Sequence, residues 1–182
     1  EVVLQELDLT ASEKLELQAF AQTNALPENR DYSYQYFRDN CSTRVRDVLD
    51  MVLEGDLKEA FGQTSTGRSY RWHTRRLTQV DPFIYVGMDA LLGPRTDAEL
   101  TIWDEMFLPL SLRDEIRDFQ VVRPDGTLKH LVGSEEIAVP STRPNEATAP
   151  PRWLLRFLAI GIIFGLAFAS LRSGFVQDSA VI

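Results

Sequence analysis

The order of hydrophobic and polar residues predicts a strand and then a helix at the start of the chain. The stretch EVVLQELDL, residues 1–9, predicts a strand or an extended segment. Thr10 and Glu13 have the spacing of a capping box, and Leu17, Phe20 and Ala21 form an apolar face at helical spacing. We therefore expect a helix that starts after Thr10 and ends near the Pro of NALPEN.

A second strand and helix are predicted around the only cysteine. Residues 31–37 alternate tyrosines with polar residues, which is typical of a short strand or an extended segment. Asn40 is a favourable N-cap, so Cys41 falls in the first turn of the following helix. That helix ends at Gly55, and its apolar stripe consists of Val45, Val48, Leu49 and Val52.

The remaining pattern favours short helices followed by a hairpin. Helices are expected within 82–93, 97–107 and 111–119, the last capped by Ser111. Pro-Asp-Gly between two β-prone runs predicts a hairpin within 119–132. The fold class is therefore α+β, with helices dominating the folded part, residues 1–137.

The C-terminal part predicts a tether. Residues 138–152 are proline-rich and have no apolar period, which indicates an extended linker. Residues 153–176 are apolar on all faces, with Trp153 at one edge and Arg156 one turn from the start, and we interpret them as a transmembrane helix. The alternative is a buried core helix. A short tail, 177–182, follows.

Charge and cysteine content exclude several functions. The net charge is −8, and residues 153–182 contribute +1, which leaves −9 for residues 1–152. A domain this acidic is not suited to nucleic acid. A single cysteine excludes an internal disulfide and a zinc site of several thiolates. We expect neither a metal nor a cofactor.

The position of Cys41 suits a nucleophile. The positive end of the helix dipole and the unpaired N–H groups of the first turn favour a thiolate. Arg38 and Arg44 act in the same direction, and Asp39 and Asp47 offset them. The alternative is a small buried apolar residue, which is the usual role of a lone cysteine.

The stretch YSYQYFRDNCSTRVRDVLD, residues 32–50, resembles the signature of the Lnb N-terminal periplasmic domain family. The resemblance extends over roughly residues 4–135 and implies a circularly permuted papain-like fold. It makes Cys41 the nucleophile that accepts an acyl group as a thioester. It also implies that Asn40, Ser42 and Thr43 shape the helix start and the oxyanion site. Arg44, Arg46 and Asp47 would then be structural or substrate-facing charges.

The resemblance also implies a function. The best-known class in this family moves an acyl chain within bacterial lipoproteins to their amino terminus. We therefore expect a thiol acyltransferase or hydrolase, anchored in the bacterial inner membrane and facing the periplasm, that acts on a membrane lipid or lipoprotein. The alternatives are a non-catalytic envelope scaffold and a cysteine peptidase or amidase of the NlpC type.

The two histidines leave the general base open. The family order places the catalytic histidine on a strand before the cysteine, but His73 and His130 both follow Cys41. We therefore expect the base in a segment preceding Glu1, which makes this chain a fragment, with His130 as the alternative base. His73 lies in the basic and aromatic stretch RSYRWHTRR, which suits anionic lipid headgroups or a lipidated substrate. The alternative is a solvated face whose arginines pair with the many carboxylates of the domain.

Overall fold

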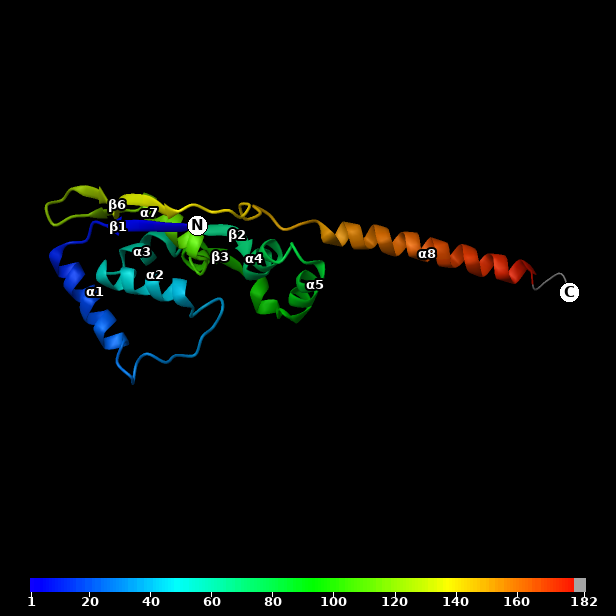
Figure 1. Ribbon diagram of the computed structural model, residues 1–182, viewed down its shortest axis with the longest axis horizontal. Coiled ribbons are helices and arrows are strands. Elements are labelled where there is room, and N and C mark those ends of the chain that lie inside the picture. The colour runs from blue at the N-terminus through cyan, green and yellow to red at the C-terminus, as the bar shows by residue number, and fades with distance from the viewer. Residues whose placement is uncertain (179–182) are drawn as a thin grey trace.

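Three pairs of antiparallel strands organise the part of the chain that the computed structural model describes, residues 1–178, with side chains described except at 154 and from 171 onward. Short helices connect these strands, and one long helix projects from the folded part (Figure 1). In chain order the elements are β1 (Val2–Leu7), α1 (Ala11–Asn24), α2 (Cys41–Val52), α3 (Asp56–Phe61), β2 (Ser65–Ser69), α4 (Tyr70–Leu77), α5 (Pro82–Leu91), the 3-10 turn η1 (Pro94–Asp97), β3 (Glu99–Thr101), α6 (Ile102–Glu105), α7 (Pro109–Asp118), β4 (Gln120–Val122), β5 (Leu128–His130), β6 (Val132–Val139) and α8 (Trp153–Asp178). The predicted α+β class is confirmed.

The first and last strands of the folded part pair with each other. β1 lies antiparallel to β6, with Val2 opposite Val139 and Leu7 opposite Val132. The other pairs are β2 with β3 and β4 with β5. The β4–β5 pair is the predicted hairpin, and Gly126 takes a positive φ of 79° in its turn, a conformation that glycine adopts without strain.

The two predicted capping sites both start helices. Thr10 and Glu13 form the expected capping box at α1, and Asn40 and Thr43 form one at α2. α1 buries none of its residues fully, although Leu17 packs against the core. α2 buries Leu49 and Val52 as expected, but its inner face also carries Arg46, while Val45 is 49% exposed.

The main core lies between α2, α3, α6, α7 and the strands β4 and β5. Its most buried members include Leu57, Met106 and Leu131, each with no exposed surface. A second, aromatic cluster of Tyr70, Leu100 and Phe107 joins α4 to β3 and to the turn after α6. This second cluster matters for the site because Phe107 also contacts the start of α2.

Of the two alternatives predicted for residues 31–37, the strand is wrong. This segment is a loop whose one bridge joins Gln35 to Asp39, and Tyr32, Tyr34 and Tyr36 are exposed. Backbone N–H groups of Arg38 and Asp39 donate to the carbonyl of Gln35, which closes a turn immediately before α2. The alternation of tyrosines is therefore not a pleated strand with one buried face.

The predicted helix at 97–107 is also wrong, because three elements replace it: the end of η1, then β3, then α6. Thr101 interrupts the run by forming a capping box with Asp104, and the N–H of Ile102 donates to the carbonyl of Thr64. Similarly, α7 begins at Pro109 rather than after Ser111. The N–H at the first position of a helix has no partner within the helix, so proline, which has no N–H, fits there at no cost.

The linker leaves the domain along α4. β6 runs to Val139, two residues into the stretch interpreted as linker. Arg76 of α4 then donates to the carboxylate of Glu146 and to the carbonyl of Ala147, both at 2.9 Å. The linker is therefore held against the domain in its second half.

The predicted C-terminal helix forms as α8, with exposed apolar side chains from Leu155 to Phe168. Within the part of the chain whose placement is described, no helix combines the length and hydropathy needed to cross a membrane. The prediction of a span at 153–176 includes side chains from 171 onward, which lie outside the described residues. Most of the predicted tail, 179–182, lies outside them too.

Candidate functional site

The start of α2 is fixed by two reciprocal hydrogen bonds. The side-chain oxygen of Asn40 accepts from the N–H of Thr43 at 2.9 Å, and the hydroxyl of Thr43 accepts from the N–H of Asn40 at 2.8 Å. Both residues are buried, so these bonds are shielded from water. Cys41 is the first residue of the helix that they define.

Further hydrogen bonds fasten this helix start to neighbouring segments. The amide nitrogen of Asn40 donates to the carbonyls of Tyr36 and Phe107, each at 2.9 Å. The hydroxyl of Ser42 donates to the carbonyl of Met106 at 2.7 Å. The side chains of Asn40, Ser42 and Thr43, which flank Cys41, therefore all hydrogen-bond to the backbone. In a site at Cys41, these three residues would hold the first turn of α2 in place.

Cys41 itself is exposed, so the alternative of a buried apolar cysteine is wrong. It lies at a groove of about 320 Å³ between α2, α7 and β1. The floor is apolar, because Leu112 and Ile116 of α7 are buried beneath it. The complete lining is Gln5, Cys41, Ser42, Val45, Pro109, Leu112, Arg113 and Ile116. An exposed thiol on an apolar groove is the main chemical feature of this face.

The first turn of α2 offers free backbone donors beside the thiol. In the described part of the chain, the N–H groups of Cys41 and Ser42 make no hydrogen bond, whereas that of Thr43 is capped by Asn40. Gln5, across the groove, cannot add a donor, because both hydrogens of its amide already donate to the carbonyl of Arg113 and to Glu135. Two helix N–H groups, those of Cys41 and Ser42, are therefore available as donors at the helix start.

Arg44 does not lie free beside the thiol. Its Nε donates to Asp39 at 2.9 Å, and its guanidinium lies 3.6 Å from the centroid of the Tyr32 ring. The pKa of the Tyr34 hydroxyl, in the same loop as Tyr32, is raised by desolvation and then by the charge of Cys41. Arg44 is therefore held by the segment that precedes α2.

Arg46 is a structural charge rather than a substrate-facing one. It is buried on the inner face of α2, where its Nε donates to Asp47 at 2.8 Å and its Nη1 donates to the carbonyl of Trp103 at 2.9 Å. Its guanidinium also lies over the Trp103 ring, 4.0 Å from the centroid. These contacts join α2 to α6.

Neither histidine of the chain lines the groove. His130 is exposed on β5, opposite Gln120, and its Nε2 lies 3.2 Å from the amide nitrogen of that residue. His73 is buried in α4, on the far side of the Phe107 ring, with ring centroids 5.8 Å apart. The role of His130 as an alternative base remains a prediction.

A buried polar network around His73 was missed from the sequence. Nε2 of His73 lies 2.9 Å from Glu105, whose other oxygen pairs with Arg68 at 2.7 Å. Burial alone raises the pKa of Glu105, but hydrogen bonds from His73 and Thr66 and the charges of His73 and Arg68 outweigh it, so this pKa is lowered overall. The interpretation of His73 as part of a solvated or lipid-facing surface is wrong.

The signal for this network was present in the sequence. Tyr70, His73, Thr74 and Leu77 are spaced as one face of a helix, and the first three are buried. The arginines of the same stretch made it look like a basic surface. Those arginines pair with carboxylates, as the alternative interpretation predicted: Arg71 and Arg75 pair with Asp89, and Arg76 pairs with Glu146.

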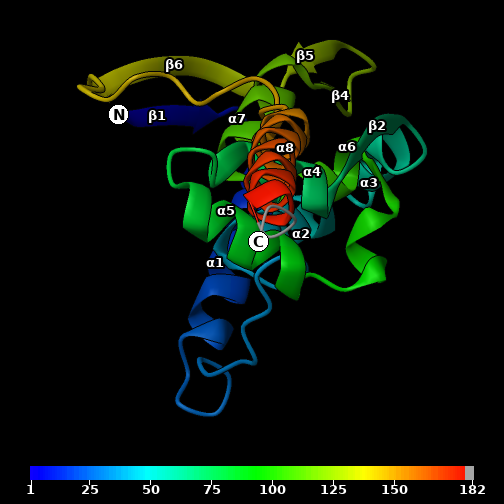
Figure 2. The same cartoon turned by 90° about the vertical axis from the view of Figure 1, so that its right-hand side faces the viewer.

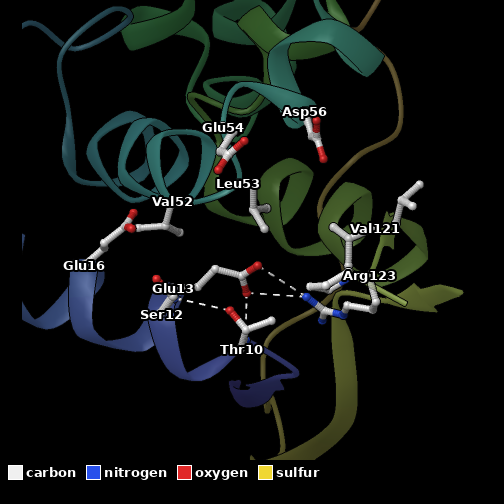
Figure 3. Close-up of a pocket in the computed structure, with 12 residues that line it drawn as sticks. Thr10, Ser12, Glu13, Glu16, Val52, Leu53, Glu54, Asp56, Val121 and Arg123 are labelled. Atoms are coloured by element: carbon white, nitrogen blue, oxygen red, sulfur yellow. Dashed lines mark hydrogen bonds and ion pairs between the residues drawn. The ribbon is translucent and has the colours of Figure 1, made fainter. Parts of the chain in front are cut away.

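A second pocket, of about 340 Å³, lies between α1, the end of α2 and β4, and four carboxylates are among its lining residues (Figure 3). Glu13 accepts from the N–H of Thr10 at 2.8 Å and pairs with Arg123 at 3.4 Å. Glu16, Glu54 and Asp56 are the other three carboxylates. Neither a thiol nor an imidazole lines this pocket. Among the described residues, no group of His, Cys, Asp and Glu is arranged to hold a metal ion.

Comparison with known proteins identifies the N-terminal part of the chain. Residues 1–78 match the model of the Lnb N-terminal periplasmic domain family. The matched range includes Cys41 and the motif around it, so the resemblance is confirmed for this part of the chain. No curated protein and no solved structure matches the chain.

Proposed function

We propose that this chain, whose residues 1–78 belong with the Lnb N-terminal periplasmic domains, is an envelope-facing thiol enzyme that transfers or hydrolyses acyl groups through Cys41. The observation that supports this most directly is the exposed Cys41 thiol on an apolar groove. A thiol so placed reaches the carbonyl carbon of an ester whose acyl chain lies along the groove.

The helix start favours both the nucleophile and its intermediate. The positive end of the α2 dipole favours a thiolate at its first residue. When this thiolate attacks a carbonyl carbon, the oxygen becomes negative and needs donors within hydrogen-bond reach. The free N–H groups of Cys41 and Ser42 would serve as these donors, and the bonds of Asn40 and Thr43 would hold them in place.

The groove favours an apolar acyl chain over a peptide. Four of its side chains are aliphatic or proline, namely Val45, Pro109, Leu112 and Ile116. Its volume of about 320 Å³ is at the small end of ligand pockets, which are typically about 300–1,000 Å³. This size suits part of a single chain, and it is why we favour a lipid or lipoprotein substrate over the peptidase or amidase alternative.

The proposed reaction has two halves. First, Sγ of Cys41 bonds to the carbonyl carbon of the donor ester, the ester C–O bond breaks, and the departing alcohol takes up the proton that the thiol gave to the base. Second, an amine or water attacks the thioester carbon and the C–S bond breaks. The thiolate is regenerated, the acyl group forms an amide or an acid, and the base accepts the proton of the attacking group.

The base would be a group outside the described groove lining. His73 is buried against Glu105 and His130 lies on the β4–β5 hairpin. The permuted papain-like arrangement places the base on a strand before the cysteine helix, and a strand beside β1 would approach the groove at Gln5. We therefore propose that the base is not one of these two histidines.

We further propose that α8 anchors the domain in the bacterial inner membrane. The helix is continuous from Trp153 to Asp178 and exposes apolar side chains on every side between Leu155 and Phe168. Exposed apolar surface of this extent is unfavourable in water and favourable in a bilayer. The anchor would hold the Cys41 groove within reach of membrane substrates.

The test is acyl labelling of the longest natural form of the protein in membranes. An alkyne-bearing long-chain thioester donor should label wild type, and the label should be released by neutral hydroxylamine, which cleaves thioesters. Cys41→Ala should abolish the label. Ser12→Ala, at an exposed serine of α1 that does not line the groove, is the control and should retain it. Equal labelling of wild type and Cys41→Ala would disprove the enzyme proposal.

A second candidate is a non-catalytic envelope scaffold. The position of both histidines away from the groove favours it, because a thiol without a base is a weak catalyst. In that case the groove would bind an apolar partner segment, and Cys41→Ala would retain full function in cells.

A further inference from the structure

The helix α5 turns its polar residues towards the domain and its apolar residues outwards. Asp89 accepts from Nε of Arg75 at 2.8 Å and from Nη1 of Arg71 at 3.0 Å, both on α4. Tyr85, one turn earlier, is buried on the same inner face. A surface helix of a water-soluble domain normally has the opposite arrangement.

The outer face of α5 is an unusually exposed apolar surface. Val80 is 90% exposed, Phe83 is 89% exposed and Leu91 is 84% exposed. We call this surface the α5 patch; its members are Val80, Phe83, Ile84, Val86, Met88 and Leu91. Single exposed apolar residues are ordinary, but a contiguous group of large ones marks an interaction surface.

The α5 patch lies on the side of the domain from which α8 departs. Figure 1 shows α5 beside the first turns of α8, and Figure 2, which looks along α8, shows α5 next to it again. The ring centroids of Tyr85 and Trp153 are 6.5 Å apart. A groove of about 380 Å³ joins the two helices, with Val86 and Phe157 among its lining residues. The patch is therefore continuous with the apolar surface of α8.

The charges around this junction suit a lipid headgroup layer. Asp89 is the carboxylate on the inner face of α5. Its pKa is lowered mainly by the hydrogen bond from Arg75 and also by the one from Arg71, and these effects outweigh burial, which raises it. Arg152 is exposed, and the guanidinium of Arg156 lies 4.7 Å from the centroid of the Trp153 ring. Tryptophan and arginine at the edge of an apolar helix are typical of the membrane interface.

From this arrangement we propose that α5 is a second membrane contact: it lies along the bilayer surface beside the point where α8 enters, with the α5 patch in the boundary between headgroups and acyl chains. Interfacial helices bury their apolar face about 5–10 Å deep at this level. The proposal rests on the anchoring role of α8 stated above. Two contacts, unlike a single flexible tether, fix the orientation of the domain on the membrane.

The test uses three single-cysteine variants of the full chain, each in a Cys41→Ser background and labelled with an environment-sensitive fluorophore. Phe83→Cys reports on α5, Ile163→Cys reports on α8, and Leu15→Cys reports on α1 at the opposite end of the domain (Figure 1). All three side chains are exposed, so the label replaces no packing contact. Each variant is reconstituted into vesicles of phosphatidylethanolamine with a minority of phosphatidylglycerol, with and without lipids brominated on the acyl chain.

We expect a blue-shifted emission at residue 83 and quenching by brominated lipid severalfold greater than at residue 15. Quenching at 163 but not at 83 would overturn the α5 proposal and leave the anchor standing. Quenching at 83 but not at 163 would support the α5 contact and overturn the anchor. A blue shift at 83 without lipid quenching would mean that a protein surface, such as a second copy, covers α5, and this too would overturn the proposal.

Discussion

Replacing Asn40 by alanine tests whether the helix start beside Cys41 is held as the structure indicates. The change removes the cap on the N–H of Thr43, a loss of about 1 kcal/mol of folding free energy. It also removes the donors to the carbonyls of Tyr36 and Phe107, at about 1 kcal/mol each. We therefore expect Asn40→Ala to lower the free energy of unfolding by about 3 kcal/mol in total.

Thr10→Ala provides the matched control. Thr10 caps α1 through the same capping box, but α1 has no fully buried residue and Thr10 makes no comparable bond to a distant carbonyl. We expect a loss of only about 1 kcal/mol there. Asn40→Ser, which keeps the capping oxygen and loses the amide donors, should fall between the two.

The assay is urea unfolding of the full chain in mild detergent, followed by tryptophan fluorescence. The midpoint should shift with little change in slope, because the surface exposed on unfolding stays the same. If Asn40→Ala costs no more than Thr10→Ala, the buried amide bonds do not hold the start of α2, and the positioning role assigned to Asn40 is wrong.

Four further predictions concern the groove, two carboxyl groups and the linker. Val45→Trp should narrow the groove beside Cys41, so that labelling by a long-chain acyl donor falls at least severalfold while labelling by an acetyl donor is retained; equal loss with both donors would contradict the assignment of the groove to the acyl chain. The pKa of Glu105 is lowered from its usual 4.5, so the ionised Glu105 stabilises the fold above pH 4.5, and this stabilisation is lost as the pH falls through the lower pKa of the folded state. Glu105→Gln should therefore reduce the loss of unfolding free energy between neutral and acidic pH, measured by urea unfolding at each pH. The pKa of Glu115 is raised by burial and then by the charge of Glu105, so the ionised form of Glu115 destabilises the fold at neutral pH. Glu115→Gln should therefore raise the free energy of unfolding at neutral pH, measured by urea unfolding. Glu146→Ala removes the partner of Arg76 and should speed proteolysis of residues 140–152, and unchanged cleavage would show that the linker is not held there.

Local signals predicted much of the fold. Thr10 and Asn40 start helices as their capping boxes indicate, and the Pro-Asp-Gly turn of the β4–β5 hairpin forms as expected. These features depend on residues a few positions apart, so the sequence carries them directly. The exposed position of Cys41 in the first turn of α2 follows from the same local reasoning, whereas the groove beside it could not be predicted.

The remainder depends on contacts between distant segments. The groove needs α7 and β1 beside α2, and the burial of His73 needs Glu105 and Phe107 from a segment about thirty residues away to neutralise and cover it. A stretch with four arginines looks like a solvated surface until those partners are known. The strand considered for residues 31–37 does not form for the same reason: among the described residues, the only bridge of this segment is the local one between Gln35 and Asp39.

The pairing of β1 with β6 sets how the domain responds to pulling. Val2 lies opposite Val139, so the point where the chain enters the folded part and the point where the tether leaves it are at the same end of an antiparallel pair. A force applied between these two points acts along the interstrand hydrogen bonds and breaks them one after another, rather than loading all of them together in shear. The domain is therefore built to open at low force from its tethered edge, and Leu7 and Val132, at the far end of the pair, would separate last.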